Sequence, residues 1–126
     1  MKKIFLTLLI IFSFSTVASA EWIKFADANN GTVGYYDPAI IKHGNIVKIW
    51  VMYDNVTVAP INGYTIKSMV GLNEYDCTER RSRSLQGTLF SENMGSGYVD
   101  SSNEVSSWEY PRPGTIYARE MDIACK

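Results

Sequence analysis

Cys77 and Cys125 are the only two cysteines in the 126 residues, and they constrain the fold more than any other feature. An even cysteine count predicts a disulfide when a chain is exported, as the N-terminal residues described below indicate, because the compartment outside the cytoplasm is oxidising. This bond would tie the middle of the chain to its C-terminus, and closing a loop of about 48 residues stabilises a fold by about 4 kcal/mol. A redox role is disfavoured, since catalytic dithiols need the close C-x-x-C spacing.

The first twenty residues predict export. Lys2 and Lys3 precede an apolar run over residues 4–14, and Ala18-Ser19-Ala20 supplies a small-residue cleavage site. The apolar run is shorter than the roughly 20 residues of a membrane-spanning helix. We therefore expect residues 1–20 to be a cleavable signal peptide. No cysteine adjoins the cleavage point, so the sequence offers no attachment there for a lipid anchor, and we expect a periplasmic, surface or secreted location.

Composition narrows the class of the mature domain, residues 21–126. It carries ten Lys or Arg and thirteen Asp or Glu, so its formal charge is 10 − 13 = −3. This mildly acidic balance disfavours nucleic acid as a partner, because phosphate binding needs clustered positive charge. Over all 126 residues, three Trp, eight Tyr and five Phe favour strands. We expect one globular domain with no integral membrane segment after cleavage.

The first half of this domain predicts a hairpin and a central strand. Asn29-Asn30-Gly31 separates two β-prone runs, Trp22–Ala26 and Thr32–Tyr36, and its Asn-Gly step is typical of a tight hairpin turn. Ile46–Tyr53 is apolar on both faces, which indicates a strand buried on two sides.

The segments around that strand are expected to be turns. Asp37-Pro38 interrupts the sheet, because proline donates no backbone N–H. Residues 39–42 are then predicted to form a single helical turn before His43-Gly44-Asn45 reverses the chain. Residues 55–63 carry Pro60 and an Asn-Gly step, so a loop is expected there.

Two longer strands are predicted at 65–76 and 79–90, joined by a tight turn at Cys77-Thr78. That turn predicts three cross-strand pairs, of which the first is an ion pair: Glu74 with Arg81, Leu72 with Arg83, and Val70 with Leu85. The alternate face would carry Met69, Gly71, Tyr75 and Cys77 opposite Ser82, Ser84 and Gln86. Because these residues include small ones and a cysteine, we expect the C-terminal element to lie over this face.

The C-terminal part predicts a long connection and a helix. Residues 91–107 are rich in Gly, Ser and Asn, which indicates a mobile connection around a short strand near Tyr98. Thr115 can cap a helix whose apolar stripe has 3.6-residue spacing. Met121, Ile123 and Cys125 also alternate with acids, which is a strand period. The good helix formers in this segment favour the helix.

No catalytic, cofactor or metal set is predicted. His43 is the single histidine and falls in a turn, where a solvated side chain is the simpler interpretation. Glu74 and Asp76 resemble the paired carboxylates of a glycosidase, but facing arginines offer ion pairing instead. Asp27-x-Asn29-x-Gly31 departs from a calcium loop, because its glycine falls one place early. Gly95-Ser96-Gly97 lacks the remaining residues of a nucleotide-binding loop.

One apolar face is left without an assigned cover. A single helix covers one side of a sheet, so the face with Val70, Leu72 and Leu85 would stay exposed unless something packs on it. A protein partner or a second copy of the chain is one possibility. The N-terminal hairpin and the long loops are the other.

Several landmarks together resemble one family, the bacterial surface-adhesin protein E-like domains. They run in order along the mature chain: Trp22-Ile23-Lys24, Tyr36-Asp37-Pro38, Gly44-Asn45, Val47-Lys48-Ile49-Trp50, Asp76 to Arg83, Met94 to Gly97, Trp108, Pro113-Gly114-Thr115 and Cys125. The resemblance implies an α+β fold, in which an antiparallel sheet of about six strands carries a C-terminal helix on one face and a Cys77–Cys125 bridge.

The resemblance also implies a role without catalysis. Name-giving members bind host extracellular-matrix and plasma proteins and can form homodimers, so the expected partner is a host or envelope protein. The alternative is a periplasmic inhibitor or accessory protein, which would insert a loop such as Met94–Tyr98 into the cleft of a cell-wall enzyme.

Overall fold

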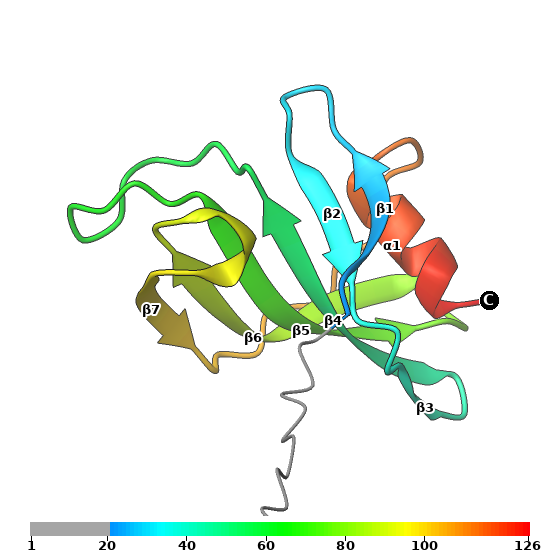
Figure 1. Ribbon diagram of the computed structural model, residues 1–126. Coiled ribbons are helices and arrows are strands. Elements are labelled where there is room, and N and C mark those ends of the chain that lie inside the picture. The colour runs from blue at the N-terminus through cyan, green and yellow to red at the C-terminus, as the bar shows by residue number, and fades with distance from the viewer. Residues whose placement is uncertain (1–20) are drawn as a thin grey trace, which may run out of the picture.

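The computed structural model describes residues 21–126, and the predicted signal peptide lies outside this part (Figure 1). Seven strands of the described chain form one sheet in which every pair is antiparallel. The elements are β1 (Ile23–Asp27), β2 (Val33–Tyr36), β3 (Ile41–His43), β4 (Ile46–Asp54), β5 (Ser68–Asp76), β6 (Arg81–Phe90), the 3-10 helix η1 (Asn93–Gly95), β7 (Tyr98–Ser102) and α1 (Ile116–Ala124). The predicted fold class, a single antiparallel sheet with a C-terminal helix, is confirmed.

The strand order is β1-β2-β4-β5-β6-β7, and β3 pairs with β4. Strands β2 and β3 share one edge of β4, because β2 pairs with residues 51–54 and β3 with residues 46–48. Strand β5 pairs along the whole other edge of β4. The predicted N-terminal hairpin is therefore present as β1 and β2, and it extends the sheet rather than folding over it.

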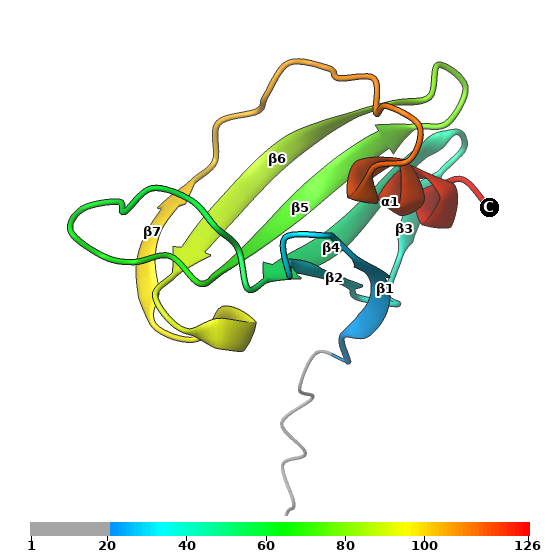
Figure 2. The same ribbon diagram turned by 90° about the horizontal axis from the view of Figure 1, so that it is seen from above.

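Helix α1 packs on one face of the sheet, here called the helix face (Figure 2). Thr115 caps it as predicted, because its Oγ1 accepts a hydrogen bond from the Ala118 N–H at 3.2 Å. The helix buries Met121 and Ala124 against β4 and β5, and the core comprises Val47, Ile49, Val51, Tyr75, Met121 and Ala124. The alternating residues of β4 thus divide between the two faces as predicted.

The disulfide joins the end of the helix to the end of β5. Cys77 directly follows β5 and Cys125 directly follows α1, with their Cα atoms 5.4 Å apart. The cysteine prediction is therefore confirmed, and so is the placement of the C-terminal element over the face that carries Tyr75. Because α1 has only nine residues, this covalent bond fixes a helix too short to be stable alone.

The predicted helical turn at residues 39–42 is wrong, because Ile41–His43 forms β3. The Asp37 side chain accepts a hydrogen bond from the Ala39 N–H at 2.9 Å, which turns the chain after β2. Gly44 then adopts a φ of 60° and closes a two-residue hairpin onto β4. The strand forms because β4 offers an unpaired edge there.

The predicted register of β5 and β6 is also wrong. Glu74 faces Arg83, Asp76 faces Arg81, and Leu72 faces Gln86. The turn spans Cys77 to Arg80 rather than two residues, because Arg80 adopts a φ of 53°. The two strands were expected to begin at residues 65 and 79 but begin at 68 and 81, and a bulge lies between Leu72 and Asn73.

The face opposite the helix is partly covered by the connection after β6. Ser68 Oγ donates to the Glu92 carbonyl at 2.7 Å and accepts from the Gly95 N–H at 2.9 Å, which holds η1 against the sheet. Met52 is fully buried on this face. The long loop thus covers one end of the apolar face as expected, whereas the N-terminal hairpin, which was expected to share this role, lies in the sheet.

Candidate functional site

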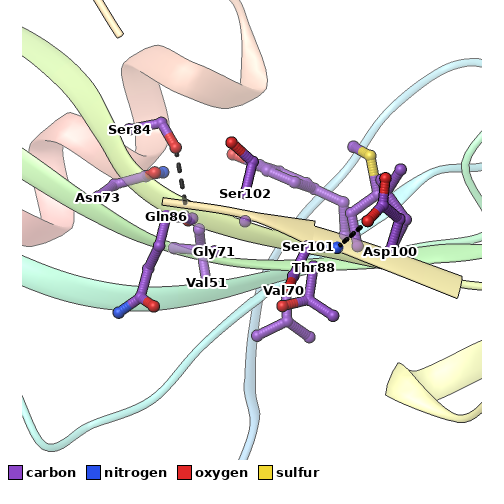
Figure 3. Close-up of a pocket in the computed structure, with 14 residues that line it drawn as sticks. Val51, Val70, Gly71, Asn73, Ser84, Gln86, Thr88, Asp100, Ser101 and Ser102 are labelled. Carbon is purple, nitrogen blue, oxygen red and sulfur yellow. Dashed lines mark hydrogen bonds between the residues drawn. The ribbon is translucent and has the colours of Figure 1, made fainter. Parts of the chain in front are cut away.

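A hollow of about 340 Å³ lies on the part of the helix face that α1 leaves uncovered. Its walls are apolar side chains from three strands: Val51, Tyr53, Met69 and Leu89. Figure 3 shows the lining residues, with Asn73 and Asp100 toward opposite ends of the group. The hollow therefore spans the sheet between the helix and the β7 edge.

Two facing glycines create this hollow. Gly71 in β5 pairs directly with Gly87 in β6, and both line the cavity. A Cβ added at Gly87 would meet no atom within 4 Å, whereas one at Gly71 would approach the Gln86 carbonyl oxygen to 3.0 Å. Glycine inside a strand is typical of a place where another group approaches the backbone closely. The missing side chains leave room for such a group.

The rim at β7 is polar. Asp100, Ser101 and Ser102 line it, and Asp100 is the only charged residue among those that line the hollow. The Ser101 N–H donates to Asp100 Oδ1 at 2.9 Å, which orients the carboxylate while the residue stays exposed. One end of an otherwise apolar cavity therefore carries a negative charge.

A buried polar cluster separates the hollow from the helix. Glu120 of α1 is 3% exposed, and its carboxylate accepts hydrogen bonds from the Tyr53 hydroxyl and, at 2.6 Å, from Asn73 Nδ2. Burial raises the pKa of Glu120 to about 7, although both hydrogen bonds act in the opposite direction. Burial, followed by the nearby Glu120 charge, also raises the pKa of Tyr53. Sequence reasoning missed this cluster.

The two carboxylates considered for catalysis are ion-paired on the opposite face. Arg81 Nε lies 3.1 Å from Asp76 Oδ2, and an Arg83 amino nitrogen lies 2.8 Å from Glu74 Oε1. A backbone hydrogen bond from Glu79, more than the Arg81 charge, lowers the pKa of Asp76. This arrangement holds the carboxylates as partners of the arginines, which is the structural interpretation favoured from the sequence.

Trp108 covers these arginines. Its ring centroid lies 4.5 Å from Arg81 Cζ and 4.3 Å from Arg83 Cζ. Glu109 and Ser82 exchange two backbone hydrogen bonds of 2.8 Å, which place the tryptophan beside β6. Two cation–π contacts and two ion pairs thus form one stack on the face opposite the helix.

We expect Trp108→Ala to lower the free energy of unfolding by about 2 kcal/mol, because it removes both cation–π contacts and a half-buried ring. Urea denaturation followed by circular dichroism measures this loss. Tyr110→Ala is the matched control: Tyr110 is 65% exposed, and its removal should change stability by less than about 0.5 kcal/mol. Equal effects of the two variants would contradict the proposed stack.

The other sequence candidates lie apart from the hollow. His43 is exposed at the end of β3, and Asp27 forms an exposed ion pair with Lys24. Gly95 belongs to η1, on the face opposite the helix. Arg80 reaches the helix, where it pairs with Asp122 at 2.9 Å. Residues 21–126 contain no group of three side chains placed to hold a metal ion.

Comparison with known proteins gives a consistent result. The model of the family described as surface-adhesin protein E matches residues 22–126. The structure of Haemophilus influenzae protein E has a TM-score of 0.60 at 16% identity, covering 85% of each chain. Protein E from non-typeable Haemophilus influenzae has a TM-score of 0.55 at 16% identity, covering 87% of this chain and 78% of that one. No curated protein matches in sequence.

No helix within residues 21–126 is long and apolar enough to cross a membrane.

Proposed function

The chain belongs to the surface-adhesin protein E family, and from that premise we propose that it is an exported, non-catalytic module that binds a host extracellular-matrix or plasma protein. Residues 1–20 would direct export and then be removed. The disulfide suits a protein that works in an oxidising compartment. The mature domain would act at the cell surface.

The observation that carries this proposal is the part of the helix face that α1 leaves uncovered. Helix α1 covers the sheet around Val47 and Tyr75, while the apolar walls at Met69 and Leu89 line an open hollow. Exposed apolar surface of this kind is typical of protein interaction sites. The polar residues of β7 border it at one end, as a polar rim borders the apolar core of an interface.

The positions and partners of Glu74, Asp76 and His43 support a role without catalysis. Glu74 and Asp76 are each held by an arginine, and the exposed His43 ends a hairpin strand. General acid–base chemistry needs a group positioned within hydrogen-bond reach of a substrate. The ion-paired acids lie on the face opposite the hollow, so they would not meet a molecule bound in it.

Binding by the mature domain tests the proposal. Immobilised residues 21–126 should bind at least one member of a panel of purified extracellular-matrix and plasma proteins saturably, as measured by biolayer interferometry. Leu89→Gln should weaken this binding by about tenfold, because it places an amide in the apolar wall. Leu72→Gln is the matched control, since this half-buried leucine faces the other side of the sheet.

Three results would contradict the proposal. The first is no binding to any panel member, and the second is equal weakening by both leucine variants. The third is inhibition of lysozyme in a turbidity assay without matrix binding, which would favour the cell-wall role instead. Protease accessibility on intact cells would separate surface from periplasm, and sedimentation velocity would detect a homodimer.

A further inference from the structure

We propose that the hollow over Gly71 and Gly87 is an anchor site for one aromatic side chain of the bound protein, with a neighbouring lysine or arginine of that protein paired to Asp100. This inference rests on the proposed function, in that it assumes a protein partner. It adds the chemical character of the segment recognised. Interfaces commonly concentrate their affinity in a few aromatic or arginine anchors that fill pockets.

The shape of the hollow suits a flat ring. Its volume of about 340 Å³ is at the low end of the roughly 300–1,000 Å³ found for small-ligand sites. Gly71 and Gly87 present bare backbone as the floor, so a planar group can lie against the sheet there. Met69 and Tyr53 stand in the wall, and methionine sulfur and tyrosine rings both make favourable contacts with aromatic groups.

The interior of the hollow offers few free polar groups. Tyr53 and Asn73 both line it, but each already donates a hydrogen bond to Glu120. No buried side-chain nitrogen or oxygen in the described residues lacks a partner. Apart from Asn73 Oδ1, which lies toward Gly71, little in the interior could replace the hydration of a polar occupant, whereas an apolar ring has no such hydration to lose. The occupant of the interior is accordingly apolar.

The charge at the rim indicates which kind of residue in the bound protein lies next to its aromatic anchor. Asp100 is exposed and is the only charged residue that lines the hollow, and no lysine or arginine lines it. The mature domain is itself acidic, with ten basic and thirteen acidic residues. Complementary charge mainly sets partner choice and association rate. A basic residue next to the aromatic anchor is therefore favoured, and an acidic one is disfavoured.

Peptide titrations monitored by NMR test this site. Acetyl-Ser-Lys-Trp-Ser-amide is added to ¹⁵N-labelled residues 21–126, with two control peptides in which Glu replaces Lys or Ala replaces Trp. The Lys-Trp peptide should shift the amide signals of Gly71 and Gly87 saturably, with a Kd on the order of 1 mM. The Glu-Trp peptide should bind about fivefold more weakly, and the Lys-Ala peptide should shift neither signal.

Two variants with matched controls locate the binding. Gly87→Phe should fill the hollow from within and weaken Lys-Trp binding by about tenfold or more, while the open space around Gly87 lets the sheet stay folded. Ser107→Phe adds the same ring at an exposed position and should have no effect. Asp100→Asn should remove the preference for Lys over Glu, and Glu104→Gln, at another exposed acid of this region, should not.

The outcomes separate this inference from the proposed function. No shift at Gly71 and Gly87, full binding by Gly87→Phe, or a Lys-to-Glu preference that survives Asp100→Asn would each overturn the anchor site. If a matrix protein binds the wild-type domain and Gly87→Phe equally, the anchor site is wrong while the proposed function stands. Failure of the whole panel counts against the proposed function, and the peptide titration still decides the anchor site.

Discussion

Replacing both cysteines, as Cys77→Ala with Cys125→Ala, is expected to lower the free energy of unfolding by about 4 kcal/mol. The bond closes a loop with a sequence separation of 48 residues, and its loss restores that conformational freedom to the unfolded chain. A domain of this size has a total stability of only about 5–15 kcal/mol. The variant should therefore melt roughly 15–30 °C lower. Scanning calorimetry and urea denaturation measure these changes.

Two controls support this interpretation. The wild-type protein treated with a reductant should lose the same stability as the double variant, and the variant itself should not respond to the reductant. In the native structure α1 buries only Met121 and Ala124 deeply in the core cluster, so the helix should be the first element to lose protection from hydrogen exchange. A loss below about 1 kcal/mol would contradict a stabilising bridge.

Glu120 is expected to make the protein less stable as the pH rises from about 4.5 to about 7. Its pKa is about 7 in the folded state, against the ordinary 4.5 of an unfolded chain. At pH values below both pKa values, Glu120 is protonated in the folded and in the unfolded state, and the protein is most stable with respect to this group. Between them only the folded state holds it, so each increase in pH favours unfolding, and the total loss is about 3 kcal/mol. Above the folded-state pKa no further loss occurs.

Glu120→Gln should abolish this pH dependence. The amide mimics the protonated acid and can still meet Tyr53 and Asn73, so the variant should match the wild type near pH 4 and exceed it by about 3 kcal/mol near pH 8. Glu109→Gln, at an exposed acid, is the control and should leave the slope unchanged. The Asp76 carboxylate has a lowered pKa, so its contribution falls away only at pH values below the ordinary 3.8. Parallel pH profiles for wild type and Glu120→Gln would refute a buried ionisable acid.

Elements set by local pattern could be predicted from the sequence. The doubly apolar run of β4, the Asn-Gly hairpin turn and the Thr115 cap are each carried by a few adjacent residues. Features that depend on distant partners could not. Strand β3 forms only because β4 offers it an edge, and the register of β5 and β6 depends on the positive φ of Arg80 and on a bulge.

The candidate site follows the same rule. Gly71 and Gly87 face each other only in the observed register, whereas the predicted pairing placed neither beside the other. Glu120 lies 67 residues from Tyr53 and 47 from Asn73, and a glutamate on an amphipathic helix is normally expected to face solvent. The apolar surface expected on the Leu72 side instead opens on the helix side, because the nine-residue helix leaves the part of that face over Gly71 and Gly87 uncovered.

The paired glycines also bear on laboratory evolution of this domain. Glycine within a strand costs roughly 0.5–1 kcal/mol relative to alanine, and position 87 has space for a larger side chain. Selection for heat resistance alone should thus enrich larger residues at Gly87 early. Clones that become more stable in this way would fold well but no longer bind their partner. A library screened for both stability and binding should therefore retain glycine at position 87.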